Sequence, residues 1–341
     1  MKITGRAVLC RMSVSVIMAA CNEENYIEEA LSSILSQTHR DIKVIVVNDA
    51  STDRTGEILE GIADDRVRVF RFAENRGAAF ALNYAAELSE GNWIAVHDAD
   101  DISYHGRIER QLEYLRKNPH LVALGTFVEC FTGPPDPVPE QELRLEEAYK
   151  NRVRTPEEIR STLLCYCPLT HGSVMFSREA FQAAGGYDSR LRIAYDYDLW
   201  TRMVNVGPVE NLPQKLYRYR RHEGALSRKW LETSRELFYS FSRYLRSSCF
   251  SHLERPPVLA VTGNKKAALN FVRQAEGIIR AVPVYQANRE NLSEIIRYYH
   301  SRRLDGAVVL NTLPGAAHVF RWLAENGMAF NENLFMFASL V

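Results

Sequence analysis

The chain has 341 residues, of which 46% are hydrophobic and 25% are charged, and this composition excludes a disordered or fibrous protein. Lysine and arginine together number 42, as do aspartate and glutamate, so the formal net charge is zero. A neutral chain has no global field that favours nucleic acid, and we expect no nucleic-acid partner.

Apolar segments of two kinds alternate after an expected leader at residues 1–12. Short runs rich in β-branched residues predict buried strands at 13–18, 42–47, 67–72 and 93–97. Apolar residues at helical spacing predict helices between them, at 27–35, 52–62 and 78–88. This order predicts an α/β fold with a doubly wound sheet.

Polar residues follow each predicted strand, at 19–22, 48–49, 75–76 and 98–101. In open α/β sheets the ligand crevice lies outside the carboxyl ends of the strands. The last of these segments, Asp98-Ala99-Asp100-Asp101, places three acids in four residues, and their mutual repulsion favours a bound divalent cation. A solvated acidic turn is the alternative interpretation.

The second half of the chain contains two breaks. The proline-rich stretch at 133–139 predicts a loop that leads into an irregular acceptor-side region, with regular structure resuming near Pro156. After Pro256-Pro257 we expect a small Rossmann-like α/β domain, with strands at 258–262, 278–284 and 307–310 and helices at 265–275, 290–303 and 316–326. This domain lacks G-x-G-x-x-G, which disfavours dinucleotide binding and favours a docking or oligomerisation role.

Six segments resemble, in the same order, the sequence patterns of the family 2 glycosyltransferases. They are SVIMAACNEENYIEEALSSILSQT, VIVVNDASTDRT, NRGAAFALNYA, GNWIAVHDADD, HGSVMFSREAFQAAGGYD and YDYDLW, and the resemblance covers about residues 13 to 227. It implies a GT-A type fold, with a doubly wound mixed sheet, over residues 13–228. It also implies transfer with inversion of the sugar's configuration.

The resemblance further implies which residues bind the nucleotide-diphosphate sugar. Asp49 matches an aspartate that accepts a hydrogen bond from the base, commonly uracil, and Asp98 matches an acid that contacts the ribose or the metal. The other implied binding residues are Ala19, Asn22, Glu23, Arg76 and Asn83. As alternatives, Asn22 and Asp49 cap the helices that follow them, and Arg76 is a surface cation.

Metal and base are implied in the same way. Asp100 matches the acid that ligates Mn²⁺ or Mg²⁺, and His222 matches a late histidine near the metal or diphosphate, with a surface histidine as the alternative. Asp196 matches the base that deprotonates the acceptor hydroxyl. The family often has Glu before this base, whereas this chain has Tyr195, so the orientation and pKa of the base are open. The turn His171-Gly172-Ser173 borders the acceptor side or is a simple turn.

Residues 229–255 form a predicted amphipathic helical linker with aromatic and basic side chains. Such a helix lies on an anionic membrane or packs on the catalytic domain. The six cysteines include no C-x-x-C pair, and no apolar run reaches the roughly 18 residues of a spanning helix. We therefore expect a cytoplasmic protein, with peripheral contact at the inner face of the membrane and homo-oligomerisation left open.

The sequence hypothesis is an inverting, metal-dependent glycosyltransferase. It would move a sugar, most simply from a UDP-sugar, to a hydroxyl of a glycan or lipid-linked acceptor in the synthesis of cell-surface polysaccharide or glycoconjugate. A non-catalytic module that binds nucleotide-sugars or glycans is the alternative. A nucleotidyltransferase would be expected to carry a glycine-rich, basic loop after the first strand, and residues 19–22 contain neither glycine nor a basic residue.

Overall fold

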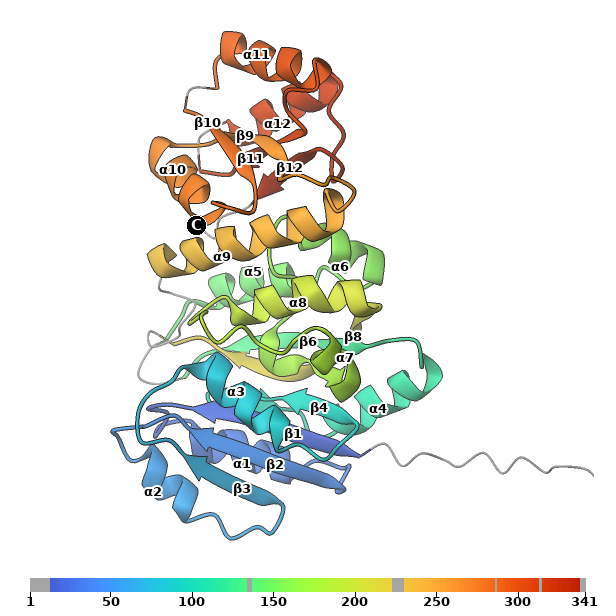
Figure 1. The fold of residues 1–341 in the computed structure, drawn as a ribbon. Helices are drawn as coiled ribbons and strands as arrows, with labels where there is room; N and C mark the ends of the chain where they lie inside the picture. The colour runs from blue at the N-terminus through green and yellow to red at the C-terminus, as the bar shows by residue number, and fades with distance from the viewer. Residues whose placement is uncertain (1–12, 134–136, 223–229, 286, 313–314, 338–341) are drawn as a thin grey trace, which may run out of the picture.

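The computed structural model describes residues 13–133, 137–222, 230–285, 287–312 and 315–337. Within these residues the chain forms an eight-stranded sheet and a four-stranded sheet. Figure 1 shows the two sheets on opposite sides of helix α9 (Trp230–Tyr244). The predicted α/β fold class is confirmed, whereas the expected leader at residues 1–12 lies outside the described residues.

The larger sheet is mixed and has the strand order β3-β2-β1-β4-β7-β6-β8-β5. Strand β1 pairs in parallel with β2 and β4, and β2 with β3. In the other half β7 is antiparallel to β4 and β6, β6 is parallel to β8, and β5 is antiparallel to β8. The strands are β1 Val14–Ala20, β2 Ile42–Asn48, β3 Val67–Arg71, β4 Trp93–Val96, β5 Ile102–Ser103, β6 Ala123–Phe131, β7 Met175–Ser177 and β8 Val209–Arg220.

Helices cover both faces of this sheet. Successive residues of β1 enter different cores, because strand side chains alternate between faces: Val16 packs with α1, α2 and α4, and Ile17 packs with α3, α6, α7 and α8. The central strands are therefore buried on both faces. The helices are α1 Ile27–Leu35, α2 Thr55–Glu60, α3 Ala78–Glu87, α4 Arg107–Lys117, α6 Pro156–Thr162, α7 Arg178–Ala183 and α8 Tyr195–Val206, with the 3-10 turn η1 at His171–Ser173.

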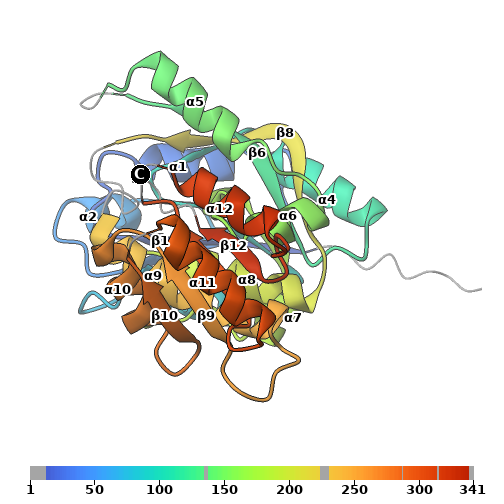
Figure 2. The same ribbon diagram turned by 90° about the horizontal axis from the view of Figure 1, so that it is seen from above.

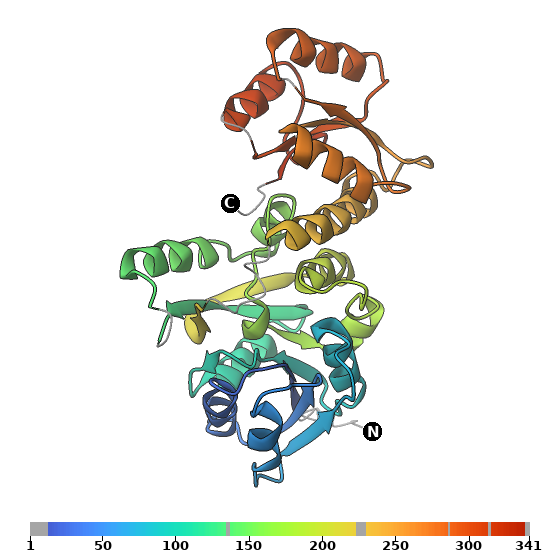
Figure 3. The same ribbon diagram turned by 90° about the vertical axis from the view of Figure 1, so that its left-hand side faces the viewer.

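The expectation of irregular structure up to Pro156 is wrong, because helix α5 spans Glu140–Lys150. None of its residues is buried, so it has no apolar stripe that would reveal a helix in the sequence. It is held to the sheet by ion pairs, Glu146 with Arg221 and Glu147 with Lys215. Figures 2 and 3 show α5 at the periphery of the molecule.

The smaller sheet is fully parallel, with the order β10-β9-β11-β12. The three strands and three helices expected in this region are present, and β12 is an additional strand that the sequence did not predict. The elements are β9 Val258–Thr262, α10 Lys265–Gln274, β10 Arg280–Val284, α11 Arg289–His300, β11 Gly306–Leu310, α12 Ala316–Glu325 and β12 Leu334–Phe337.

Helix α9 packs between the two sheets and continues into a π-helical turn at Leu245–Cys249. Phe241, which is fully buried, lies 4.4 Å from Phe337 between ring centroids, and Phe238 lies 5.4 Å from Phe271. On the other side Arg243 forms an ion pair with Asp198 of α8 at 3.2 Å. Phe238 and Phe241 are therefore internal, and their ring contacts are with the smaller sheet's unit, whereas the packing alternative placed this helix on the catalytic domain. The side chain of Trp230 lies outside the described part of the chain.

Candidate active site

The polar strand ends meet as the sequence predicted. Ala20 of β1 is in register with Asn48 of β2, and Ile17 of β1 with Val96 of β4. Residues 21–23, Asp49 and the acidic run that begins at Asp98 therefore follow three adjacent strands. Ala19 is the half-buried penultimate residue of β1, beside this edge.

Asp98 is held by the turn η1. Its Oδ1 lies 2.9 Å from Nδ1 of His171, and the backbone of Gly172 also hydrogen-bonds its carboxylate. Burial alone would raise the pKa of Asp98, but His171, by its charge and hydrogen bond, together with His97 and the backbone of Gly172 holds this pKa below its ordinary value. Asp98 is therefore a fixed, ionised group at the strand ends.

Asp100 and His222 are in contact, with 2.9 Å between Oδ2 and Nε2. Both side chains are mostly buried. A carboxylate oxygen and an imidazole nitrogen side by side fit a divalent cation that takes its other ligands from a diphosphate and water. Within the described residues no cluster of three or more His, Cys, Asp or Glu side chains could hold an ion by itself.

Glu23, in the loop after β1, lies near the same acids. Burial raises the pKa of its carboxyl to about 8, and the charges of Asp100, Asp53 and Asp98 add to this rise. Burial is thus the main cause of the raised pKa, and the neighbouring acids are the second. Glu23 thus belongs to the acidic group, while its backbone N–H donates to Oγ1 of Thr55 at 2.7 Å.

Asp49 and Asn22 hydrogen-bond the loops that follow strands β2 and β3. The two carboxylate oxygens of Asp49, which is buried, accept the backbone N–H groups of Arg76 and Gly77, each at 2.7 Å. Asn22 has a positive φ of 61°, and its side-chain oxygen accepts the N–H of Thr52 at 2.8 Å. A nucleotide base would therefore share the carboxylate of Asp49 with the loop that leads into α3.

Arg76 and Asn83 lie in different places. The exposed guanidinium of Arg76 stacks on the ring of Phe80, 3.3 Å from its centroid. Asn83, on α3, bonds the backbone of Tyr187: its side-chain oxygen accepts the N–H at 2.9 Å and its amide donates to the C=O at 2.8 Å. The side chain of Asn83 thus bonds the loop that leads into α8.

Asp196 lies in the first turn of α8, half-buried, and its Oδ1 accepts the N–H of Tyr197 at 2.6 Å. Burial raises the pKa of its carboxyl, and the charge of His171 opposes that rise. Asp198, two residues later, is fully buried and paired with Arg202 and Arg243. Asp198 is therefore committed to ion pairs, and Asp196 is the more exposed of the two acids.

Two positioning residues were not anticipated from the sequence. Arg107 of α4 is fully buried beneath the acidic run and donates to the C=O of Val96 at 2.9 Å; burial lowers its pKa to about 10, while nearby acids counteract the effect. Glu236 of α9 accepts the N–H groups of residues 192–194, each at 2.8 Å, just before α8 begins. A carboxylate at this helix end is favourable. Neither residue stands in a recognisable motif.

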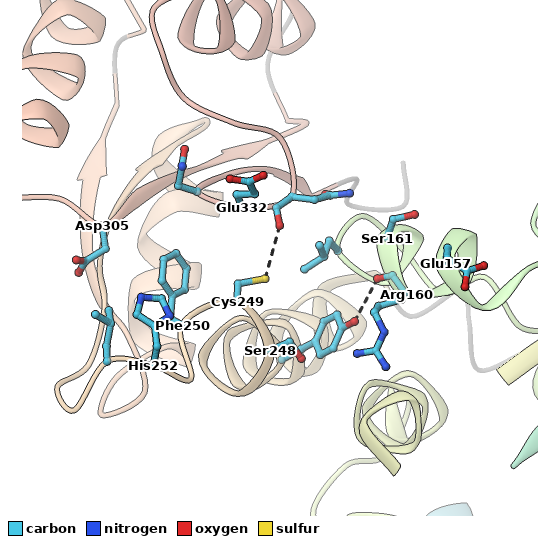
Figure 4. Close-up of a pocket in the computed structure, with 14 residues that line it drawn as sticks. Glu157, Arg160, Ser161, Ser248, Cys249, Phe250, His252, Asp305 and Glu332 are labelled. Atoms are coloured by element: carbon cyan, nitrogen blue, oxygen red, sulfur yellow. Dashed lines mark hydrogen bonds between the residues drawn. The ribbon is translucent and has the colours of Figure 1, made fainter. Parts of the chain in front are cut away.

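Two cavities lie away from these residues. One, of about 680 Å³, is lined by α6, the π-helical turn and loops of the second sheet, and includes Arg160, Cys249 and Glu332 (Figure 4). The other, of about 620 Å³, lies between β10 and α11. None of the predicted site residues lines either cavity. No described helix has the length and apolar character required to cross a membrane.

Comparison with known proteins gives consistent relatives. Residues 15–185 match the family model described as glycosyl transferase family 2. An uncharacterized glycosyltransferase of Haemophilus influenzae is 31% identical over 212 residues, covering 61% of this chain and 65%, just under two thirds, of that relative. The putative glycosyltransferase EpsE of Bacillus subtilis is 29% identical over 282 residues, covering 78% of this chain and 97% of EpsE.

Solved structures with a similar fold are transferases. S. aureus TarS 1–349 in complex with UDP-GlcNAc has a TM-score of 0.56 at 15% identity, over 92% of this chain and 89% of that chain. The mannosyltransferase PcManGT of Pyrobaculum calidifontis, in complex with GDP-Man and Mn²⁺, has a TM-score of 0.51 at 18% identity, over 92% and 79%. At these identities the likeness concerns the fold, which is of the GT-A type.

Proposed function

This chain belongs to glycosyl transferase family 2, and on that premise we propose that it transfers a sugar, with inversion, from a nucleotide-diphosphate donor to an acceptor hydroxyl. The observation that carries the proposal is the placement of two kinds of acid around one histidine. Asp98 binds the Nδ1 side of His171, and the charge of Asp196 acts on the same imidazole. Donor-binding and proton-accepting groups therefore flank one site.

The residues have distinct roles in this proposal. Asp49 accepts a base N–H, Asp98 contacts the ribose, and Ala19, Asn22, Glu23 and Arg76 border the nucleotide. Asn83 acts indirectly, through Tyr187. Asp196 accepts the proton of the acceptor hydroxyl while that oxygen attacks the sugar on the face opposite the departing diphosphate.

Asp100 and His222 would hold Mn²⁺ or Mg²⁺. A divalent cation there would supply Lewis-acid neutralisation of the charge that develops on the leaving diphosphate. The donor we propose is a UDP-sugar; the fold neighbour TarS is described in complex with UDP-GlcNAc. The acceptor we propose is a glycan or lipid-linked glycan at the cytoplasmic face of the membrane.

The division of labour along the chain is part of the proposal. Residues 13–228 form the glycosyltransferase domain, 229–255 the linker, and 256–341 a docking or oligomerisation module. The parallel four-stranded sheet within the last segment and the burial of α9 against it support this division.

The test is a screen of UDP- and GDP-sugars with and without Mn²⁺, read as thermal stabilisation and as release of the nucleoside diphosphate. We expect one donor class to stabilise the protein, because a ligand that binds the folded state raises its stability. Asp100→Ala should abolish the Mn²⁺-dependent release, and Asp65→Ala, at an exposed acid, should not. Full Mn²⁺-dependent activity of Asp100→Ala would refute the metal assignment, and binding without turnover would favour the non-catalytic alternative.

A further inference from the structure

His171 occupies the junction between the donor side and the acceptor side of the site. It is 8% exposed and uses both ring nitrogens: Nδ1 lies 2.9 Å from Oδ1 of Asp98, and Nε2 lies 3.0 Å from the hydroxyl of Tyr187. The two partners are 89 residues apart in the chain. A buried imidazole with two directional contacts has one orientation.

The contact with Asp98 is built into the turn η1. Nδ1 of His171 and the backbone of Gly172 both hydrogen-bond the carboxylate of Asp98. The next residue, Gly172, has no space for a side chain, because a Cβ there would lie 2.6 Å from Oδ2 of Asp98 and 2.0 Å from the hydroxyl of Tyr217. The turn η1 therefore lies close to both carboxylate oxygens of Asp98.

The contact with Tyr187 connects His171 to the acceptor side. Tyr195, the first residue of α8, packs edge-on against the ring of His171 at 5.4 Å and against Tyr187 at 5.7 Å. Asp196 follows Tyr195 directly. The aromatic residue that replaces the family's usual Glu is thus in contact with the imidazole that holds Asp98.

Asn83 of α3 holds the backbone of Tyr187 in place. It bonds both the N–H and the C=O of Tyr187, and the hydroxyl of that tyrosine faces His171. This gives Asn83 a function at a distance from the nucleotide. The chain of contacts runs from α3 through Tyr187 and His171 to Asp98.

We propose that His171 is a positioning residue that keeps the donor-side carboxylate of Asp98 and the base-bearing start of α8 in a fixed relation; this inference rests on the proposed function. Each ring nitrogen has its own partner and its own role. The Nδ1 side orders Asp98 for the nucleotide, and the Nε2 side, with Tyr187 and Tyr195, orders the segment that carries Asp196.

Two substitutions separate the two sides. In His171→Asn the amide nitrogen lies near the position of Nδ1, so the contact with Asp98 is retained and that with Tyr187 is lost. In His171→Gln the amide lies near the position of Nε2, with the opposite result. Tyr187→Phe removes the hydroxyl alone, and His105→Gln, at an exposed histidine, is the matched control.

The measurements are the dissociation constants of UDP and GDP by calorimetry, the turnover of the donor that the parent protein accepts, and the thermal midpoint. We expect His171→Asn and Tyr187→Phe to bind the nucleotide within about threefold of the parent and to lose about tenfold in kcat, the cost of one buried hydrogen bond. His171→Gln should weaken nucleotide binding by about tenfold, because its lost partner is charged.

Equal nucleotide affinities and equal rates in the folded Asn and Gln variants would overturn the inference, because packing alone would then account for His171. If either variant fails to fold, Tyr187→Phe decides, and an unchanged kcat overturns it. A parent protein that binds neither UDP nor GDP would instead refute the proposed function, and the inference with it.

Discussion

The acids of the site have different environments, and these suggest different roles. His171 holds the pKa of Asp98 below its ordinary value in spite of burial, whereas burial raises the pKa of Asp196 and of Glu23. Carboxyl groups whose pKa values are pushed apart are typical of sites that divide binding from proton transfer. These environments agree with the proposed roles, in which Asp98 binds the nucleotide and Asp196 accepts the proton.

Replacing Asp196 tests its role as the base. We expect Asp196→Asn to lower kcat by about 10²- to 10⁴-fold, because an amide cannot accept the acceptor proton. Nucleotide affinity, measured by calorimetry, should stay near that of the parent. Glu179→Gln, at an exposed carboxylate of α7, is the control and should be fully active. Retained turnover in the Asn variant would show that another group is the base.

The pH dependence of the rate follows from the same carboxyl. Only deprotonated Asp196 accepts a proton, and burial raises its pKa, so the active form is lost on acidification at a pH above the ordinary aspartate value of about 4. We therefore expect kcat/KM to rise with pH through that raised value and then level off, measured in overlapping buffers. A rate that is flat down to the ordinary aspartate range would contradict this expectation.

Single residues also mark the limit of what sequence predicts. The acids at strand ends were predictable because a strand's direction places the residue after it. The partners of Asn83 and Asp49 were not, since these side chains bond backbone groups 104 and about 27 residues away. Arg107 was not singled out in the sequence, and only the fold shows that it is buried.

Among the elements, the turn η1 bears most directly on the site. Gly172 lies so close to Tyr217 and Asp98 that a Cβ would overlap both. We expect Gly172→Ala to lower the thermal midpoint and to weaken nucleotide binding, because Asp98 must move. Gly106→Ala is the matched control, since its Cβ would have 4.0 Å to its nearest neighbour. Equal midpoints and affinities in the two variants would contradict the close approach.

The elements that sequence predicted well are strands buried on both faces and helices with one apolar face. Strands β1, β2 and β9 and helices α10 and α12 begin and end within a few residues of their expected positions, because burial imposes their pattern. Helix α5 escaped prediction because none of its residues is buried, and ion pairs and the partly buried Leu143 hold it. The strand β12 follows a loop that starts at Gly327 and has no periodic signal of its own.

On the scale of the whole molecule, α9 joins the two sheets into one structure. Phe241 contacts Phe337 and Phe271 of the smaller sheet's unit. On the other side of α9, Glu236 accepts the N–H of Ala194 just before α8, and Arg243 pairs with Asp198 within α8. The start of α8 is therefore supported from a helix that also anchors the C-terminal unit.

Removing the ring of Phe241 should lower the stability of the whole protein. We expect Phe241→Ala to reduce the free energy of unfolding by about 3–5 kcal/mol, the usual cost of removing a buried aromatic ring. Urea unfolding followed by fluorescence and by circular dichroism measures the change. Arg235→Ala, on the exposed side of α9, should shift it by at most about 0.5 kcal/mol. A loss as small as that of the control would show that the two units do not depend on this contact.

The acidic run also has a place in the time course of synthesis. Asp101 accepts the backbone N–H of Arg220 at 2.6 Å, and β5 pairs with β8, so the loop is completed by residues 119 positions later. At about 5–20 residues per second, a ribosome needs about 6 to 24 s to cover that distance. A nascent chain therefore carries its acids without their β8 partners for seconds, and the site forms only when most of the chain has been made.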